Sequence, residues 1–74
     1  MTEKKHTYTV VLPDGFKATR TTHRTYIGAI ACKDAYDEWF ALTWVGREDL
    51  VEAALGMARK KSYCREARLV RVEA

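Results

Sequence analysis

Apolar and polar side chains alternate along the first part of the chain, which is the pattern of a half-buried β-strand. Residues 6–12 are rich in Thr, Tyr and Val, and the alternation places Tyr8, Val10 and Leu12 on one face. A Pro-Asp-Gly triplet follows and predicts a turn, since proline presets φ and glycine accepts positive φ. Residues 16–21 then predict a second strand, and the two strands together predict a β-hairpin.

The middle of the chain predicts a second hairpin. Residues 26–33 are compatible with a strand or a helix, because Ile and Cys suit the former, Ala tolerates the latter and Gly28 weakens both. We favour a strand, because residues 34–37 resemble a turn and residues 38–45 are strongly strand-like.

A helix is predicted over residues 47–61, after a break at Gly46. Acidic residues occupy its first turn and basic residues its last, as the helix dipole favours. An apolar stripe at helical spacing is expected to pack on a sheet: Leu50, Val51, Ala54, Leu55 and Ala58. Residues 67–72 alternate again and predict a last strand.

The element order is therefore ββββαβ, which indicates an α+β fold. We expect a two-layer arrangement, in which an antiparallel sheet of four to five strands carries the one helix on one face. Residues 1–74 are too few for two cores, so the chain is expected to be a single domain, with residues 1–5 disordered.

The composition fits a globular chain, with 47% hydrophobic and 31% charged residues. No run approaches the roughly 18 apolar residues of a membrane span, and the polar first residues do not resemble a signal peptide. Two cysteines, Cys32 and Cys64, suit free thiols in the cytoplasm better than a secreted disulfide framework. The net charge of +3 permits an anionic partner without requiring one.

Candidate chemistry is sparse, and we predict a protein that is not an enzyme and holds no metal or cofactor. The histidines and cysteines have no metal-ligand spacing, and no phosphate-binding glycine motif is present. The single serine, Ser62, stands beside basic residues without an acid–base pair. A domain this small also offers little room for a small-molecule substrate.

Binding to another protein, or self-association, is the leading functional hypothesis. Trp39 and Trp44 have opposite parity, so a regular strand would point them to opposite faces of the sheet. One helix covers only one face, which would leave an indole for an interface. The predicted interface residues are Trp39, Trp44, Tyr26, Arg20, His23 and Arg24.

Nucleic-acid binding is the alternative hypothesis. Basic residues cluster at the bend after the second strand and around the end of the helix, and phosphate contacts need such charges. Aromatic residues on a sheet face would stack bases. The residues assigned to this alternative are Arg59, Lys60, Lys61, Arg65 and Arg68.

The sequence also contains Asp14-Gly15, Thr19-Arg20-Thr21 and Arg24-Thr25-Tyr26, followed by a Trp-bearing strand and the predicted helix. This order resembles small accessory proteins encoded by phages of actinobacteria, over residues 8–55. The chain departs from that pattern just after Tyr26. The resemblance implies a protein of the bacterial cytoplasm that engages a host factor, and it implies no catalytic residues.

Overall fold

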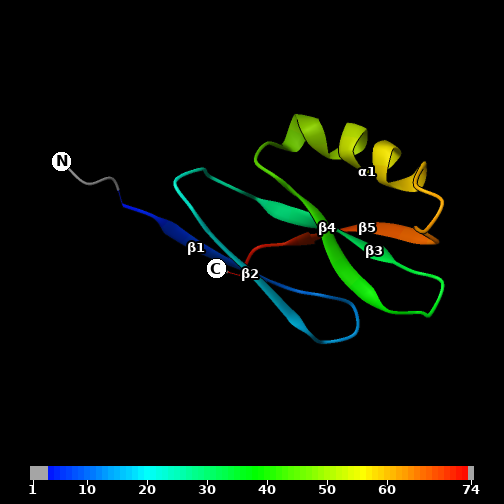
Figure 1. The fold of residues 1–74 in the computed structure, drawn as a ribbon. Coiled ribbons are helices and arrows are strands. Elements are labelled where there is room, and N and C mark those ends of the chain that lie inside the picture. Colours follow the sequence, from blue (N-terminus) through cyan, green and yellow to red (C-terminus); the bar gives the residue numbers. More distant parts are fainter. Residues whose placement is uncertain (1–3, 74) are drawn as a thin grey trace.

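The computed structural model describes residues 4–73, which form five strands and one α-helix with a short 3₁₀ turn before it (Figure 1). The elements are β1 (His6–Val11), β2 (Lys17–Thr22), β3 (Gly28–Lys33), β4 (Trp39–Val45), η1 (Glu48–Leu50), α1 (Val51–Arg59) and β5 (Glu66–Arg71). The α+β class and the strand assignment of residues 28–33 are thus confirmed. Residues 1–5 are expected to be disordered. The first three of them lie outside the described residues, and Lys4 and Lys5 are exposed.

The expectation of one continuous sheet is wrong. The strands form an antiparallel β1–β2 hairpin and a separate three-stranded antiparallel sheet of order β4-β3-β5. Within residues 4–73, an isolated bridge of Val10 with Val72 joins the two just beyond the end of β5. The chain reaches β5 after α1. Strand β5 pairs with β3, which leaves β4 at an edge of the sheet.

The core lies between the three-stranded sheet and α1. Strand β3 is central and almost wholly buried, and every second side chain, Ile30 and Cys32, points to the helix side. There they meet Ala58 of α1, with Val45 and Ala67 of the flanking strands. Val51, Ala54 and Leu55 also pack on this cluster, as the apolar stripe predicts.

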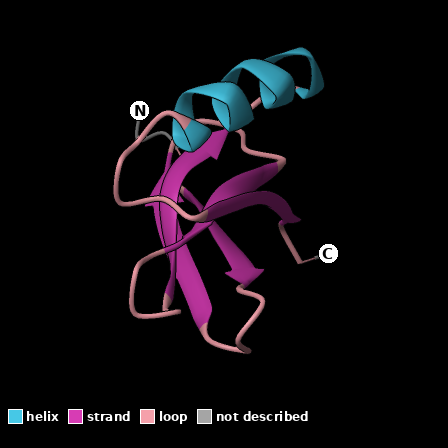
Figure 2. Ribbon diagram, turned by 90° about the vertical axis from the view of Figure 1, so that its right-hand side faces the viewer, coloured by secondary structure: helices cyan, strands magenta, loops and turns pink. Residues whose placement is uncertain are grey.

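The other face of the three-stranded sheet is covered by the β1–β2 hairpin, so the two-layer expectation is also wrong (Figures 1 and 2). Ala29 and Ala31 alternate with the helix-facing residues of β3, and both are fully buried although α1 lies on the opposite side. Val10 of β1 and Leu12 just after it, which the alternation places on one face, are buried as well.

The two tryptophans share one face of the sheet, contrary to the parity argument. Lys33 pairs with Trp39 and Ala29 pairs with Trp44, and paired residues of an antiparallel ladder point the same way. The register shifts between Ile30 and Ala31, which makes Leu42 an extra residue in β4. Such a bulge reverses the alternation beyond it. Both indoles therefore lie on the hairpin side of the sheet, and both are half-buried.

The helix is shorter than the predicted 47–61. Its α-helical part begins at Val51 after the 3₁₀ turn and ends at Arg59. Because Leu50 belongs to η1, it does not join the buried stripe and is 47% exposed. Within residues 4–73, no helix has the length and apolar character needed to cross a membrane.

Candidate functional site: an arginine–aromatic groove

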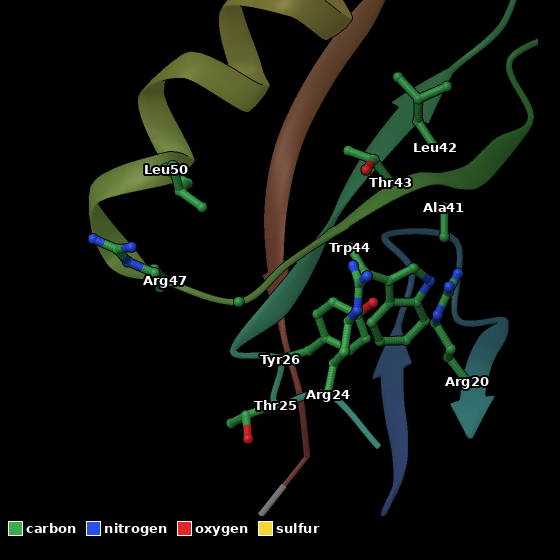
Figure 3. Close-up of a pocket in the computed structure, with 11 residues that line it drawn as sticks. Arg20, Arg24, Thr25, Tyr26, Ala41, Leu42, Thr43, Trp44, Arg47 and Leu50 are labelled. Carbon is green, nitrogen blue, oxygen red and sulfur yellow. The ribbon is translucent and has the colours of Figure 1, made fainter. Parts of the chain in front are cut away.

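A groove of about 750 Å³ opens between the hairpin, β4 and the turn that leads into α1 (Figure 3). Three arginines and two aromatic rings dominate its wall, and we call it the arginine–aromatic groove. Its lining residues are Arg20, Arg24, Thr25, Tyr26, Ala41, Leu42, Thr43, Trp44, Gly46, Arg47 and Leu50. No carboxylate, imidazole or thiol is among them. The groove thus combines positive charge with aromatic surface, and the Tyr26 hydroxyl is its one side-chain group of a kind that commonly transfers protons.

A chain of ring contacts runs from the wall of the groove into the hairpin. The ring centroids of Tyr26 and Trp44 are 5.7 Å apart, and those of Tyr8 and Tyr26 are 5.8 Å apart with an edge-on angle of 77°. Such tilted and edge-to-face pairs are favourable beyond their buried area. Tyr8 comes from the hairpin, Tyr26 from the segment before β3 and Trp44 from β4, so the rings connect both sheets.

The arginines differ in how they are held. Arg20 projects from β2 with its guanidinium carbon 5.6 Å from the centre of the Tyr26 ring, a cation–π contact. Arg47 makes two hydrogen bonds to Asp49, of 2.8 and 3.1 Å. Among residues 4–73, no carboxylate forms an ion pair with Arg20 or Arg24. In Figure 3, the Trp44 indole lies between these two arginines.

The bend after β2 and the turn after β4 meet at one rim of the groove because Gly46 has no side chain. A Cβ at this glycine would lie 2.7 Å from the carbonyl oxygen of Thr25. The amide of Ile27 donates to the carbonyl of Val45 at 2.8 Å and ties the same two segments together. This close approach brings Arg24 and Arg47 to one site although they are far apart in the sequence.

The far side of the η1 turn is held to β5. Arg71 donates from both terminal guanidinium nitrogens to the carboxylate of Glu48, with the longer bond at 3.2 Å. The hydrogen bond from Arg71 lowers the pKa of the Glu48 carboxyl below its ordinary value. The contact spans 23 positions of sequence and fixes the turn that carries Arg47 and Leu50.

Four of the six predicted interface residues line this groove: Arg20, Arg24, Tyr26 and Trp44. Trp39 lies near the other end of β4, where the guanidinium carbon of Arg68 is 5.0 Å from its ring centre. His23 is exposed in the bend after β2 and does not line the groove. Sequence reasoning missed Arg47. The signal that could have identified it as a groove residue is its position directly after Gly46, which ends the strand that carries Trp44.

The residues assigned to nucleic-acid binding differ in their surroundings. Arg59, Lys60 and Lys61 are exposed at the end of α1. Arg68 instead forms an ion pair with Glu66 at 3.0 Å and stacks on Trp39. Arg65 lines a small cavity of about 280 Å³ together with Lys33, Asp37 and Glu66, where acidic and basic groups alternate.

The two thiols contact each other in the helix-side core. Cys32 is buried, and half-buried Cys64 packs on the same cluster and directs its thiol to the carbonyl of Glu66 at 3.4 Å. Burial raises the pKa of the Cys32 thiol to about 12, and its contact with Cys64 acts in the same direction. Among the described residues, no three His, Cys, Asp or Glu side chains gather as metal ligands would.

Comparison of the chain with protein families, with curated proteins and with solved structures found no match. The resemblance to phage accessory proteins therefore stays a prediction. The functional argument for this chain rests on the geometry of its own groove.

Proposed function

We propose that this chain is a non-enzymatic binding module that holds an acidic segment of a protein partner in the arginine–aromatic groove. The observation that carries the proposal is the meeting of Arg20, Arg24 and Arg47 around the Tyr26 and Trp44 rings, with no carboxylate in the lining. Arginine and tryptophan in a partly desolvated hollow are the residues that dominate protein interfaces.

The charge of the groove indicates the chemistry of the partner. Two of its guanidinium groups, those of Arg20 and Arg24, have no ion pair with any described carboxylate. A partner carboxylate would supply a charge-assisted hydrogen bond with bidentate geometry. The half-buried rings add apolar area that a partner would remove from water.

The resemblance of residues 8–55 to phage accessory proteins suggests the setting for this proposal. The chain would then act in the cytoplasm of a host bacterium, and its acidic partner would be a host or phage protein. Binding alone is sufficient for such a role, because occupying a surface can block it.

The proposal is tested by titrating the protein with an end-blocked octapeptide of glutamate. Because the chain has two tryptophans, the Trp39→Phe variant leaves Trp44 as the only indole to report binding by fluorescence. In that background, replacing Arg20 and Arg24 by Ala is expected to weaken binding at least tenfold. The matched control replaces Arg59 and Lys60 by Ala, which removes the same charge from the helix end and is expected to change affinity less than twofold.

The outcomes separate the hypotheses. Equal weakening by the two pairs of substitutions would mean unspecific attraction to a basic protein and would overturn the proposal. Tighter binding of an octamer of deoxythymidine than of the glutamate peptide, lost on replacement of Arg20 and Arg24, would assign the groove to phosphate and favour the nucleic-acid alternative. The affinity for the deoxythymidine octamer would in that case also fall steeply with salt concentration.

A further inference from the structure

Strand β4 forms an edge of the three-stranded sheet, since within residues 4–73 it pairs only with β3. Its seven residues contain no charged side chain, and five of them are Trp, Phe, Ala or Leu. The strand is half-buried along most of its length rather than covered. Natural proteins usually protect such an edge with charges or a covering segment, because its outer backbone groups attract another strand.

The bulge at Leu42 divides this edge, and its second part, residues 43–45, is regular. On one side of it lies the arginine–aromatic groove, to which Ala41 and Trp44 point in Figure 3. On the other side, Leu42 points away from the rings of the groove in the same view, and Leu42 and Thr43 line a cavity together with Ala54 and Met57 of α1.

The helix side of this edge is also hollowed, and its wall is mostly apolar, with Lys61 as its charged lining residue. Two neighbouring cavities of about 330 and 230 Å³ share Ala54 and Met57 of α1 as lining residues. Met57 is 65% exposed, and Leu50 at the end of the second cavity is 47% exposed. An apolar groove therefore follows one face of the edge while a cationic groove follows the other.

We infer that the acidic partner segment binds as an added strand on the outer edge of β4, with acidic and apolar residues in alternation. This inference rests on the proposed function of the groove. Successive side chains of a strand point to opposite faces. One alternate set would then place carboxylates among Arg20, Arg24 and Arg47, while the other set would cover Met57 and Leu50. Backbone hydrogen bonds to β4 would supply affinity, and the two grooves would supply specificity.

Charge complementarity argues for this partner over a second copy of the chain. A symmetric pair of β4 edges would set two arginine-lined grooves side by side on one face. Because β4 itself has no carboxylate, nothing in the paired strands would offset that repulsion. A nucleic acid would satisfy the arginines but would leave the apolar groove beside Met57 open.

The test uses an end-blocked octapeptide of alternating glutamate and valine on the full chain. An isomer with four glutamates followed by four valines has the same composition and charge, and it is expected to bind at least tenfold more weakly. Two further peptides carry N-methyl groups on all valines or on all glutamates. In an extended strand these two sets of amides point to opposite edges, so methylation of one set is expected to abolish binding and methylation of the other to leave it within threefold.

Hydrogen exchange of the protein supplies the second measurement. The bound alternating peptide is expected to slow exchange of the Trp44 amide, which points outward among residues 43–45, at least tenfold. The amides of β2 are the control and are expected to change little.

Failure of this inference is distinguishable from failure of the proposed function. If the alternating and block peptides bind equally and both depend on Arg20 and Arg24, strand addition is overturned and the acidic-segment proposal stands. If the two methylated peptides behave alike, whether both bind or both fail, strand addition is overturned as well. If no acidic peptide binds, both proposals fall, and a β4-mediated dimer in solution would overturn the choice of partner.

Discussion

At the scale of single residues, the alternation of small and branched side chains along β3 decides which layers pack on it. Ile30 and Cys32 face α1, whereas Ala29 and Ala31 face the hairpin. The sequence marks all four as apolar, but it contains no signal for the second layer above the alanines. At Asp34, by contrast, the sequence is explicit, since its carboxylate accepts from the amides of Tyr36 and Glu38 and makes the turn.

Cys32 makes the pH dependence of stability predictable. In the unfolded chain its thiol ionises near the ordinary pKa of 9.0, whereas in the fold its pKa is raised to about 12. Between these values the unfolded state binds fewer protons than the native state, so the free energy of unfolding falls as pH rises. The slope reaches at most about 1.4 kcal/mol per pH unit.

We therefore expect urea denaturation at pH 7 to 11 to show a steeper loss of stability above pH 9 in the native chain than in Cys32→Ala. The variant is expected to be less stable at neutral pH because it loses buried contact. The prediction concerns the difference between the two curves, so titration of groups that do not contact Cys32 cancels. Parallel curves above pH 9 would contradict it.

At the scale of elements, strand β4 and helix α1 show where pattern reasoning holds and where it fails. The strand and its approximate bounds follow from its composition, but the parity of Trp39 and Trp44 does not survive the bulge at Leu42. No residue type in this strand announces that bulge. The helix is recognisable from its stripe, yet its first predicted turn is 3₁₀ and Leu50 is displaced to the groove rim.

Alanine substitutions at two glycines, one in a helix and one in a strand, are expected to change the stability of the fold in opposite directions. Gly56 lies inside α1, and outside its chain neighbours and the backbone of its own helix no atom lies within 4 Å of the position that a Cβ would take there. Gly56→Ala is therefore expected to stabilise the fold by about 1 kcal/mol through helix propensity. At Gly28 of β3 a Cβ would lie 2.4 Å from the carbonyl oxygen of Val70. Backbone atoms of β5 cannot move away without breaking the β3–β5 ladder, so Gly28→Ala is expected to destabilise.

Thermal denaturation of both variants beside the native chain checks this pair. An increase in Tm of several degrees is expected for Gly56→Ala and a decrease for Gly28→Ala. A drop in Tm for the helix variant would show that α1 tolerates less bulk at Gly56 than the structure indicates.

At the scale of the whole molecule, the hairpin builds both the second core layer and one wall of the groove. Val10 is fully buried, its strand meets Val72 in the isolated bridge, and the amide of Glu73 donates to the carbonyl of Thr9 at 2.8 Å. The rings of Tyr8, Tyr26 and Trp44 continue this contact to the groove. Stability and the candidate site are therefore coupled through the docking of the hairpin.

The Val10→Ala substitution tests that coupling. Loss of a buried valine side chain is expected to cost about 2 kcal/mol of stability. Because the hairpin also positions Arg20, the affinity for the glutamate octapeptide is expected to fall at temperatures where the variant is still folded. Val11→Ala, at the exposed neighbouring position, is the matched control. Loss of stability with unchanged affinity would show that the groove forms without a fully docked hairpin.

The sequence by itself determined the local elements: the two hairpins, the helix, the last strand and the α+β class. These depend on periodicity, turn residues and charge at helix ends, which act within a few residues. It also singled out four groove residues, Arg20, Arg24, Tyr26 and Trp44, because charge and aromaticity are visible in residue types.

Only the tertiary structure decided that the strands divide into two sheets, that the hairpin covers the second face and that both indoles share it. These features depend on long-range pairing, on the approach of Gly46 to Thr25 and on one extra residue in β4. Each arises from contacts between segments far apart in the chain. Such contacts form only when the chain is folded. The groove depends on such contacts, because Arg47 comes from a turn that no local pattern connects to Arg20 and Arg24.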